Sequence, residues 1–255
     1  MTTEPDMPES NPLGGHPAHA RGDPQDTRLV STDRVLIVAP HPDDEVLAAG
    51  GLLQHAVDRR APVRIRYVTR GENNPWAQRA HEGRWRITAA DRERWACLRQ
   101  REALASLTHL GLQPDCTHSL AFSDQGLTDL VMSGNRAFVE LLADEIAFWK
   151  PTLLLVPATF DAHPDHSALG VLAQFALARA AISHQRPKTL AYLIHRARGP
   201  KPPGTKRFAL TPVQILQKRL AILCHRSQLR LRRRFLLEFA GATEEFHEIA
   251  GGRDT

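Results

Sequence analysis

The chain has 255 residues, 42% of them hydrophobic, which predicts one domain with a substantial core and leaves little room for a second. Its 33 lysines and arginines exceed its 28 acidic residues by a formal charge of +5, a mild bias that indicates an anionic partner only where the positive charges cluster. Three widely separated cysteines without a CxxC pair exclude a disulfide framework and a thiolate zinc site, and no apolar run is long enough to cross a membrane, so we expect a soluble cytoplasmic protein.

The first 30 residues are rich in proline, glycine and polar residues and have no hydrophobic period. This composition predicts a disordered leader at residues 1–30, followed by a single domain over residues 31–255. His16 and His19 lie in the leader, and we expect them to be bystanders rather than metal ligands.

After the leader, apolar strand-like runs alternate with helical patterns. Strands are expected at 35–38, 63–69, 117–122, 153–156 and 189–195, and helices near 47–60, 90–110, 134–149 and 166–182. This alternation predicts a Rossmann-like α/β fold, with a mostly parallel sheet and helices on both faces. The prolines and glycines of residues 196–206 argue against regular structure there. Thr211 and Pro212 then open a helix, which begins a C-terminal helical extension.

One imidazole and three carboxylates follow the first expected strand directly, in the sequence APHPDDE at residues 39–45. Three acids in consecutive positions repel one another unless a cation or the positive end of a helix compensates them. The carboxyl ends of strands in an open α/β sheet are also where ligands bind. Taken alone, however, Asp43, Asp44 or Glu45 could equally serve as a helix cap.

A second polar cluster, FDAHPDHSALG at residues 160–170, follows the strand LLLV. It presents His163, Asp165 and His166 in one turn, although His166 alone could be an ordinary helix N-terminal residue. Because parallel strands end at one edge of a sheet, the two clusters can meet in space. A hydrolytic zinc ion needs three nitrogen or oxygen ligands and an open position, with a further carboxylate as base. Spacing alone does not say which carboxylate is the ligand and which is the base.

Together, the two clusters resemble the PIG-L/LmbE family of zinc-dependent N-acetylglucosaminyl deacetylases. Further similarities extend over roughly residues 34–229. They are TRGE at 69–72, RQRE at 99–102, SDQGL at 123–127 and KRLAILCHRSQL at 218–229.

The resemblance implies that His41, Asp44 and His166 hold the zinc ion. Asp43 would be the general base that deprotonates the zinc-bound water, and His163 would polarise or protonate the tetrahedral intermediate. Members of the family remove the acetyl group of an N-acetylated sugar, so the expected substrate is a small-molecule or lipid-linked amino sugar. Iron or manganese could replace zinc, since sites rich in nitrogen and oxygen accept several divalent metals. The oligomeric state is left open.

Further candidates for substrate binding are Arg70, Trp76, Arg99, Asp124 and His225. Residues 73–95 carry three of the four tryptophans and match no motif of the family. One interpretation is a lid whose indoles stack on sugar rings. In the alternative, Trp85 and Trp95 only pack a helix against the core. The other histidines, His195 among them, have no ligand spacing and are expected to be ordinary surface or core residues.

Five arginines lie between Arg226 and Arg234, interleaved with Leu229 and Leu231. They could form an amphipathic face for anionic lipid or nucleic acid, or simply a solvated helix face. We expect no nucleic-acid partner, and at most a weak contact with a membrane surface.

Two alternatives to sugar deacetylation stay open. An amidase that acts on another acyl group or on a thiol conjugate would use the same metal chemistry. A non-catalytic Rossmann-like binding module is disfavoured, because the first turn is acidic and lacks a GxGxxG motif to cradle a pyrophosphate.

Overall fold

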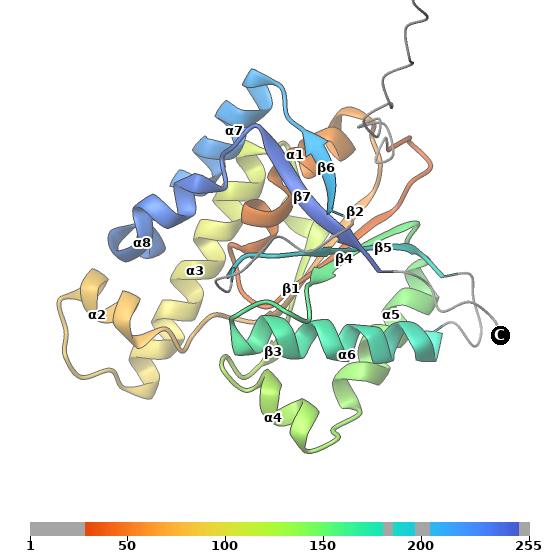
Figure 1. The fold of residues 1–255 in the computed structure, drawn as a ribbon. Coiled ribbons are helices and arrows are strands. Elements are labelled where there is room, and N and C mark those ends of the chain that lie inside the picture. Colours follow the sequence, from red (N-terminus) through yellow and green to blue (C-terminus); the bar gives the residue numbers. More distant parts are fainter. Residues whose placement is uncertain (1–28, 181–185, 197–204, 250–255) are drawn as a thin grey trace, which may run out of the picture.

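A computed structural model of the chain describes residues 29–180, 186–196 and 205–249 (Figure 1). Seven strands form one sheet in the order β3-β2-β1-β4-β5-β7-β6. Strands β1 to β5 are all parallel to one another, whereas β7 pairs antiparallel with both β5 and β6. The strands are β1 (Val35–Ala39), β2 (Val63–Thr69), β3 (Thr117–Phe122), β4 (Leu153–Pro157), β5 (Lys188–Tyr192), β6 (Thr205–Ala209) and β7 (Thr243–Glu248).

Helices cover both faces of the sheet (Figure 1). One layer contains α1 (Asp44–Asp58), α3 (Ala89–His109), α7 (Pro212–Leu223) and α8 (Arg226–Glu238), and the other contains α4 (Leu127–Met132), α5 (Ala137–Trp149) and α6 (Pro164–Ala180). A short helix, α2 (Pro75–Glu82), packs against α8. Successive side chains of β1 alternate between the two layers: Val35 and Ile37 join one apolar cluster, and Leu36 and Val38 the other. The predicted fold class is confirmed.

The expected strands and helices are found close to their predicted bounds, with differences at the ends. The strand expected at 189–195 ends at Tyr192, and the helix expected from 166 begins at Pro164. Helix α7 begins as the sequence indicates: the Thr211 hydroxyl accepts a hydrogen bond from the backbone N–H of Gln214, while the Gln214 side chain accepts one from the Thr211 N–H.

The C-terminal part is not purely helical, which corrects the prediction. Residues 196–206 were expected to lack regular structure, but β6 begins at Thr205, and β7 adds a second strand to the sheet. Residues 197–204 lie outside the described ranges. Both strands are rich in charged residues, TKRFA and TEEFHE, so they lack the apolar run that marks β1 to β5.

A buried ion pair explains why so polar a strand can join the sheet. Lys218 Nζ lies 2.7 Å from Glu244 Oε1, and each side chain is 1% exposed. The Glu244 carboxylate also accepts hydrogen bonds from the backbone N–H groups of Gly51 and Leu52. This network fastens β7 and α7 to α1, the helix that begins at Asp44.

The described part of the chain begins at Leu29, which is buried in the core. The predicted leader up to residue 28, with His16 and His19, lies outside the described residues. Within the described residues, no helix is both long and apolar enough to cross a membrane.

Candidate metal and catalytic site

The turn after β1 holds the residues of the first polar cluster at the carboxyl edge of the sheet. Asp43, at the N-cap of α1, has a φ of 147°, a region that is strained for residues other than glycine. The Asp44 carboxylate accepts a hydrogen bond from the backbone N–H of His41 at 3.0 Å, and the N–H of Asp43 donates to Glu45 Oε2 at 3.1 Å. Strained backbone conformations of this kind occur preferentially at functional sites.

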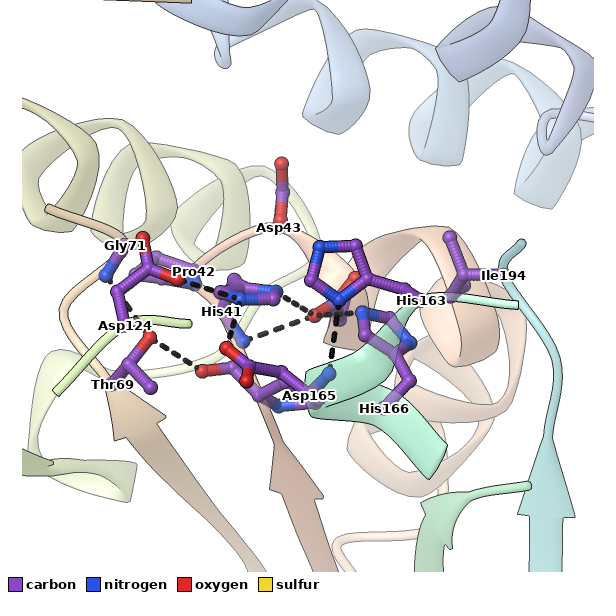
Figure 2. Close-up of polar contacts among 12 residues, drawn as sticks. His41, Pro42, Asp43, Thr69, Gly71, Asp124, His163, Asp165, His166 and Ile194 are labelled. Carbon is purple, nitrogen blue, oxygen red and sulfur yellow. Dashed lines mark hydrogen bonds and ion pairs between the residues drawn. The ribbon is translucent and has the colours of Figure 1, made fainter. Parts of the chain in front are cut away.

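The three predicted metal ligands meet around one oxygen atom. Asp44 Oδ2 lies 3.2 Å from His41 Nδ1 and 3.2 Å from His166 Nε2. All three side chains are buried, and the two imidazoles lie close together from separate segments (Figure 2). Donors that surround a tetrahedral zinc ion at 2.0–2.2 Å are about 3.4 Å apart, so this spacing suits a zinc-sized cation. The donor set therefore fits the metal that the sequence implies.

Asp161 orients one of these ligands. Its Oδ2 lies 3.3 Å from His166 Nδ1, which leaves the other ring nitrogen facing Asp44. The same carboxylate accepts backbone hydrogen bonds from His163, Ile194 and His195. A carboxylate behind a metal-binding histidine is a common arrangement in metalloproteins. Asp161 stands in the second cluster, five residues before His166, but it was not among the residues expected to act in the site.

A second group of possible ligands, His41, His163 and Asp165, shares one residue with the first. Its donors are engaged with the backbone: the Asp165 carboxylate accepts from the N–H groups of Gln125 and Leu127, and the N–H of Asp165 donates to His163 Nδ1. Asp165 thus fixes the loop after β3, and the group of His41, Asp44 and His166 is better suited to hold a cation.

The charges at the site compensate one another. Burial opposes ionisation of Asp44, but His166 and His41 hold the pKa of its carboxyl well below the usual range. Burial likewise opposes charge on His166, yet Asp44 and Asp161 raise its pKa to about 9. Asp124, Asp165 and Asp44 also hold the pKa of His41 well above its usual value despite burial. Asp44 is therefore negative and faces protons on both imidazoles. A divalent cation bound here would take the place of those protons.

Arg99 supports the turn that carries Asp43. Its Nη2 lies 3.0 Å from Asp43 Oδ1 and donates to Pro42 O, and its Nη1 donates to Gly71 O. A Cβ atom on Gly71, whose φ is +66°, would lie 2.1 Å from Arg99 Nη1, so this approach requires glycine. The guanidinium lines the cavity, but its contacts mark it as a support for Asp43.

Glu102, the last residue of the RQRE motif, contacts helix α8 on the other side of the site. The Glu102 carboxylate accepts hydrogen bonds from the backbone N–H and the hydroxyl of Ser227, in the first turn of α8. Helix α3 therefore links the β1 turn to α8 through two side chains that are three positions apart.

The remaining candidates for substrate binding lie at different depths. Asp124 is buried in the site: its Oδ1 is 3.1 Å from His41 Nε2, and its Oδ2 accepts from the N–H of Asn73. Arg70 instead pairs with Glu93 through two contacts of 2.7 Å and is not among the residues that line the cavity. His225 is 1% exposed and also does not line the cavity, and burial, with Arg99 nearby, lowers its pKa to about 3.

The tryptophans of residues 73–95 divide into two kinds. Trp95 is fully buried, as the packing alternative expects. Trp76 and Trp85 are 63% and 74% exposed, lie edge to face, and both contact the guanidinium of Arg79. The packing alternative is therefore wrong for Trp85. Trp76 is not among the described residues that line the cavity, and its role in a lid stays a prediction.

A cavity of about 190 Å³ opens over Asp43 and His163. Helix α8 supplies one wall, with Gln228, Arg232, Phe235 and Leu236. His195 completes it: its ring stacks on Phe235 at 5.5 Å and lies 5.2 Å from the ring of His163. The expectation that His195 is an ordinary histidine is wrong. Its position three residues after β5 matches that of the other two clusters and was the available signal.

Comparison with known proteins identifies the family. Residues 36–177 match the model of the PIG-L family, described as GlcNAc-PI de-N-acetylase. The chain belongs to this family. Two curated relatives, the 1D-myo-inositol 2-acetamido-2-deoxy-alpha-D-glucopyranoside deacetylases of Mycobacterium sp. strains KMS and JLS, are each 29% identical to this PIG-L protein in an alignment of 150 residues that covers 52% of the chain and 46% of the relative. The chain thus spans about half the length of these relatives.

Several solved structures share the fold of this PIG-L protein. A triple mutant of a deacetylase of the teicoplanin biosynthetic pathway is 23% identical, with a TM-score of 0.65, over 87% of this chain and 100% of that one. The zinc-inhibited form of teicoplanin deacetylase Orf2 is 20% identical over the same shares, with a TM-score of 0.65. GalB, the 4-carboxy-2-hydroxymuconate hydratase of Pseudomonas putida KT2440, is 17% identical with a TM-score of 0.62, over 88% and 98%. Because one fold carries both activities, the reaction has to be argued from the site.

Proposed function

We propose that this PIG-L protein is a metal-dependent hydrolase that removes the acetyl group of an N-acetylated amino sugar. The observation that carries the proposal is the single oxygen of Asp44 within 3.2 Å of both His41 and His166, beside a cavity that Asp43 and His163 line. The match to the GlcNAc-PI de-N-acetylase family and the names of the curated relatives support an acetylated amino sugar as substrate.

His41, Asp44 and His166 would hold a divalent cation, which we propose is zinc, or iron or manganese in its place. When bound, such a cation supplies Lewis-acid chemistry: it polarises a carbonyl group and makes water more acidic. The two imidazoles and one carboxylate are the kind of ligand set that hydrolytic metal sites use.

Asp43 is the proposed general base. It lines the cavity next to Asp44, but its Oδ1 contacts Arg99 rather than the metal ligands, so a carboxylate oxygen is left to accept a proton. A water molecule that attacks the acetyl carbon passes its proton to Asp43 as the new carbon–oxygen bond forms. The carbon–nitrogen bond then breaks as Asp43 returns this proton to the departing nitrogen, and acetate and the free amine leave.

His163 is the proposed stabiliser of the negative charge that develops on the carbonyl oxygen. Because the backbone N–H of Asp165 donates to His163 Nδ1, the ring proton lies on Nε2. Burial, with His41 and His166, lowers the pKa of His163 to about 4, so the ring is neutral near pH 7. A neutral ring can donate one hydrogen bond to an oxyanion. This favours polarisation of the intermediate over its outright protonation.

The cavity is small. At about 190 Å³ it lies below the 300–1,000 Å³ of typical ligand pockets, so it suits the acylated end of a substrate rather than a whole glycoconjugate. The rest of a larger substrate would extend past the exposed side chains at the rim.

The first test is elemental analysis of the purified protein and of a His41→Ala/His166→Ala double variant. The control is His118→Ala, which replaces an exposed histidine. About one metal ion per chain is expected in the wild type and in the control, and none in the double variant. A double variant that keeps its metal would contradict the assignment of the site.

The second test is release of carboxylic acid from N-acyl amino sugars, with other N-acyl amines and N-acylated thiol conjugates as the alternative substrates. Asp43→Asn should keep its metal and lose about 100-fold or more in kcat. An Asp43→Asn enzyme of near-native activity would refute the base assignment, and hydrolysis confined to other acyl groups would favour the amidase alternative.

A further inference from the structure

Arg232 stands apart from the other arginines of α8. It has φ −125° and ψ 29°, so the helix is kinked at this residue. Among the five arginines of α8, it alone lines the cavity. By contrast, Arg230 donates to the carbonyl of Ala80 in α2, and Arg234 lies 3.6 Å from Glu238.

Arg232 is not required to neutralise the carboxylates that line the cavity. The carboxylates that line it are already matched: Asp43 contacts Arg99, Asp44 contacts two imidazoles, and Asp124 contacts His41. Among the described residues, no carboxylate lies within ion-pair distance of Arg232, which is solvent-exposed at the rim. Its positive charge is therefore available to a ligand.

A stack of rings holds this guanidinium in place. Its central carbon lies 4.8 Å from the centre of the Phe235 ring, and Phe235 stacks at 15° on His195, which lies next to His163. A guanidinium that rests its face on an aromatic ring keeps the N–H donors along its edge free. Those donors form a fork that matches the oxygens of a phosphate or a carboxylate.

Two neutral amides lie in the cavity lining near Arg232. Gln228 lies one turn earlier on α8 and also lines the cavity, as does Asn74, whose amide donates to Gln228 Oε1. The lining of the cavity thus combines buried carboxylates and imidazoles, two neutral amides, and one exposed cation without an acidic partner among the described residues.

We infer that Arg232 recognises an oxyanion on the substrate, a phosphate or a carboxylate that lies away from the amide to be cleaved. This inference rests on the proposed function and adds the substrate class: an N-acyl amino sugar that carries a negative charge. Arg232 acts as a specificity determinant, since its guanidinium is placed to bind the substrate without touching the reacting atoms.

Binding of the deacetylated sugars tests this without turnover. Glucosamine, glucosamine 6-phosphate, glucosamine 1-phosphate and the corresponding amino uronic acid are titrated into the metal-loaded protein by calorimetry. The variants are Arg232→Gln, Arg232→Lys and, as matched control, Arg233→Gln, which removes the same charge from the adjacent exposed residue of the same helix.

We expect the wild type and Arg233→Gln to bind at least one of the anionic sugars about tenfold or more tightly than glucosamine, as a charge-assisted contact allows. Arg232→Gln should lose most of this preference and Arg232→Lys should keep part of it. The anionic sugar that is preferred tells whether the group is a phosphate or a carboxylate. Equal affinity for all four sugars in the wild type, or a preference that survives in Arg232→Gln, would overturn the inference.

The kinetic counterpart is the ratio of kcat/KM for the matching anionic and neutral N-acetyl sugars, which Arg232→Gln should lower by a similar factor. If no amide is hydrolysed, the proposed function fails, whereas the titration still reports on Arg232. The two failures are therefore distinguishable.

Discussion

Replacing Arg99 by lysine keeps the positive charge beside Asp43 and removes the fork that holds the turn. In the wild type, Arg99 Nη2 forms an ion pair with Asp43 and donates a hydrogen bond to the carbonyl of Pro42, while Nη1 donates one to the carbonyl of Gly71. Lysine offers one nitrogen in place of two, so it cannot reach both sets of acceptors. At least one charge-assisted hydrogen bond to a buried carbonyl is lost, which costs about 1.5–3 kcal/mol of stability.

The loss of these hydrogen bonds should also lower the rate of the proposed reaction. Asp43 has a strained backbone, and Arg99 is its ion-pair partner, so a looser contact lets its carboxylate shift. A displacement of about 1 Å at a reacting group can lower the rate about 100-fold. We therefore expect Arg99→Lys to lower kcat by about 10- to 100-fold, with metal content unchanged.

The assays are urea unfolding of the metal-loaded protein and measurement of kcat and kcat/KM for the best substrate of the acyl panel. Arg101→Lys, an exposed arginine of the same helix, is the matched control and should resemble the wild type in both. An Arg99→Lys enzyme with the unfolding midpoint and kcat/KM of the wild type would refute the view of Arg99 as the support of Asp43.

Three further predictions concern stability and metal retention. Lys218→Met leaves the Glu244 carboxylate buried without its cation and should lower the free energy of unfolding in urea by about 3–5 kcal/mol. Adding Glu244→Gln should recover part of this loss, and a single variant within about 1 kcal/mol of the wild type would contradict the prediction. His225 has a pKa of about 3 in the folded protein against about 6.5 when unfolded, so the unfolded chain binds an extra proton between these values and stability falls as the pH drops below about 6.5. His225→Asn should make the fall between pH 6.5 and 5 shallower by up to about 1.4 kcal/mol per pH unit, and an unchanged slope would count against a neutral His225. Asp161→Asn removes the charge behind His166 and should weaken metal affinity about 10- to 100-fold in a chelator titration, whereas native affinity would show that Asp161 only braces the backbone.

The sheet from β1 to β5 and the meeting of the two polar clusters could be predicted from the sequence because both depend on local patterns, whereas the choice of His41, Asp44 and His166 as metal ligands followed from the resemblance to the family. Each of these strands is a short run of mostly apolar or β-branched residues, and the two polar clusters follow β1 and β4, which are neighbours in the sheet. His41, Asp44 and His166 are 125 positions apart at the extremes, but the topology brings their ring nitrogens and carboxylate within reach of one another.

The rest of the structure depends on partners that are remote in the sequence. Strand β7 buries Glu244, a residue that argues against a buried strand until Lys218 is known to meet it. His195 and Arg232 have no motif, because each acquires its place through Phe235, which belongs to the C-terminal helix. Arg99 was expected to contact substrate, and only the three-dimensional arrangement shows that its two terminal nitrogens contact Asp43 and the carbonyls of Pro42 and Gly71.

The cavity draws its two sides from different parts of the chain. The groups proposed for bond cleavage lie between His41 and His166, within the segment that matches the family, whereas the wall of α8 comes from residues 228–236, beyond the end of that match at residue 177. Reactivity and selectivity can therefore diverge separately among relatives. A chimera in which only α8 is exchanged should have the substrate selectivity of the protein that donated α8 and the catalytic residues of the other parent.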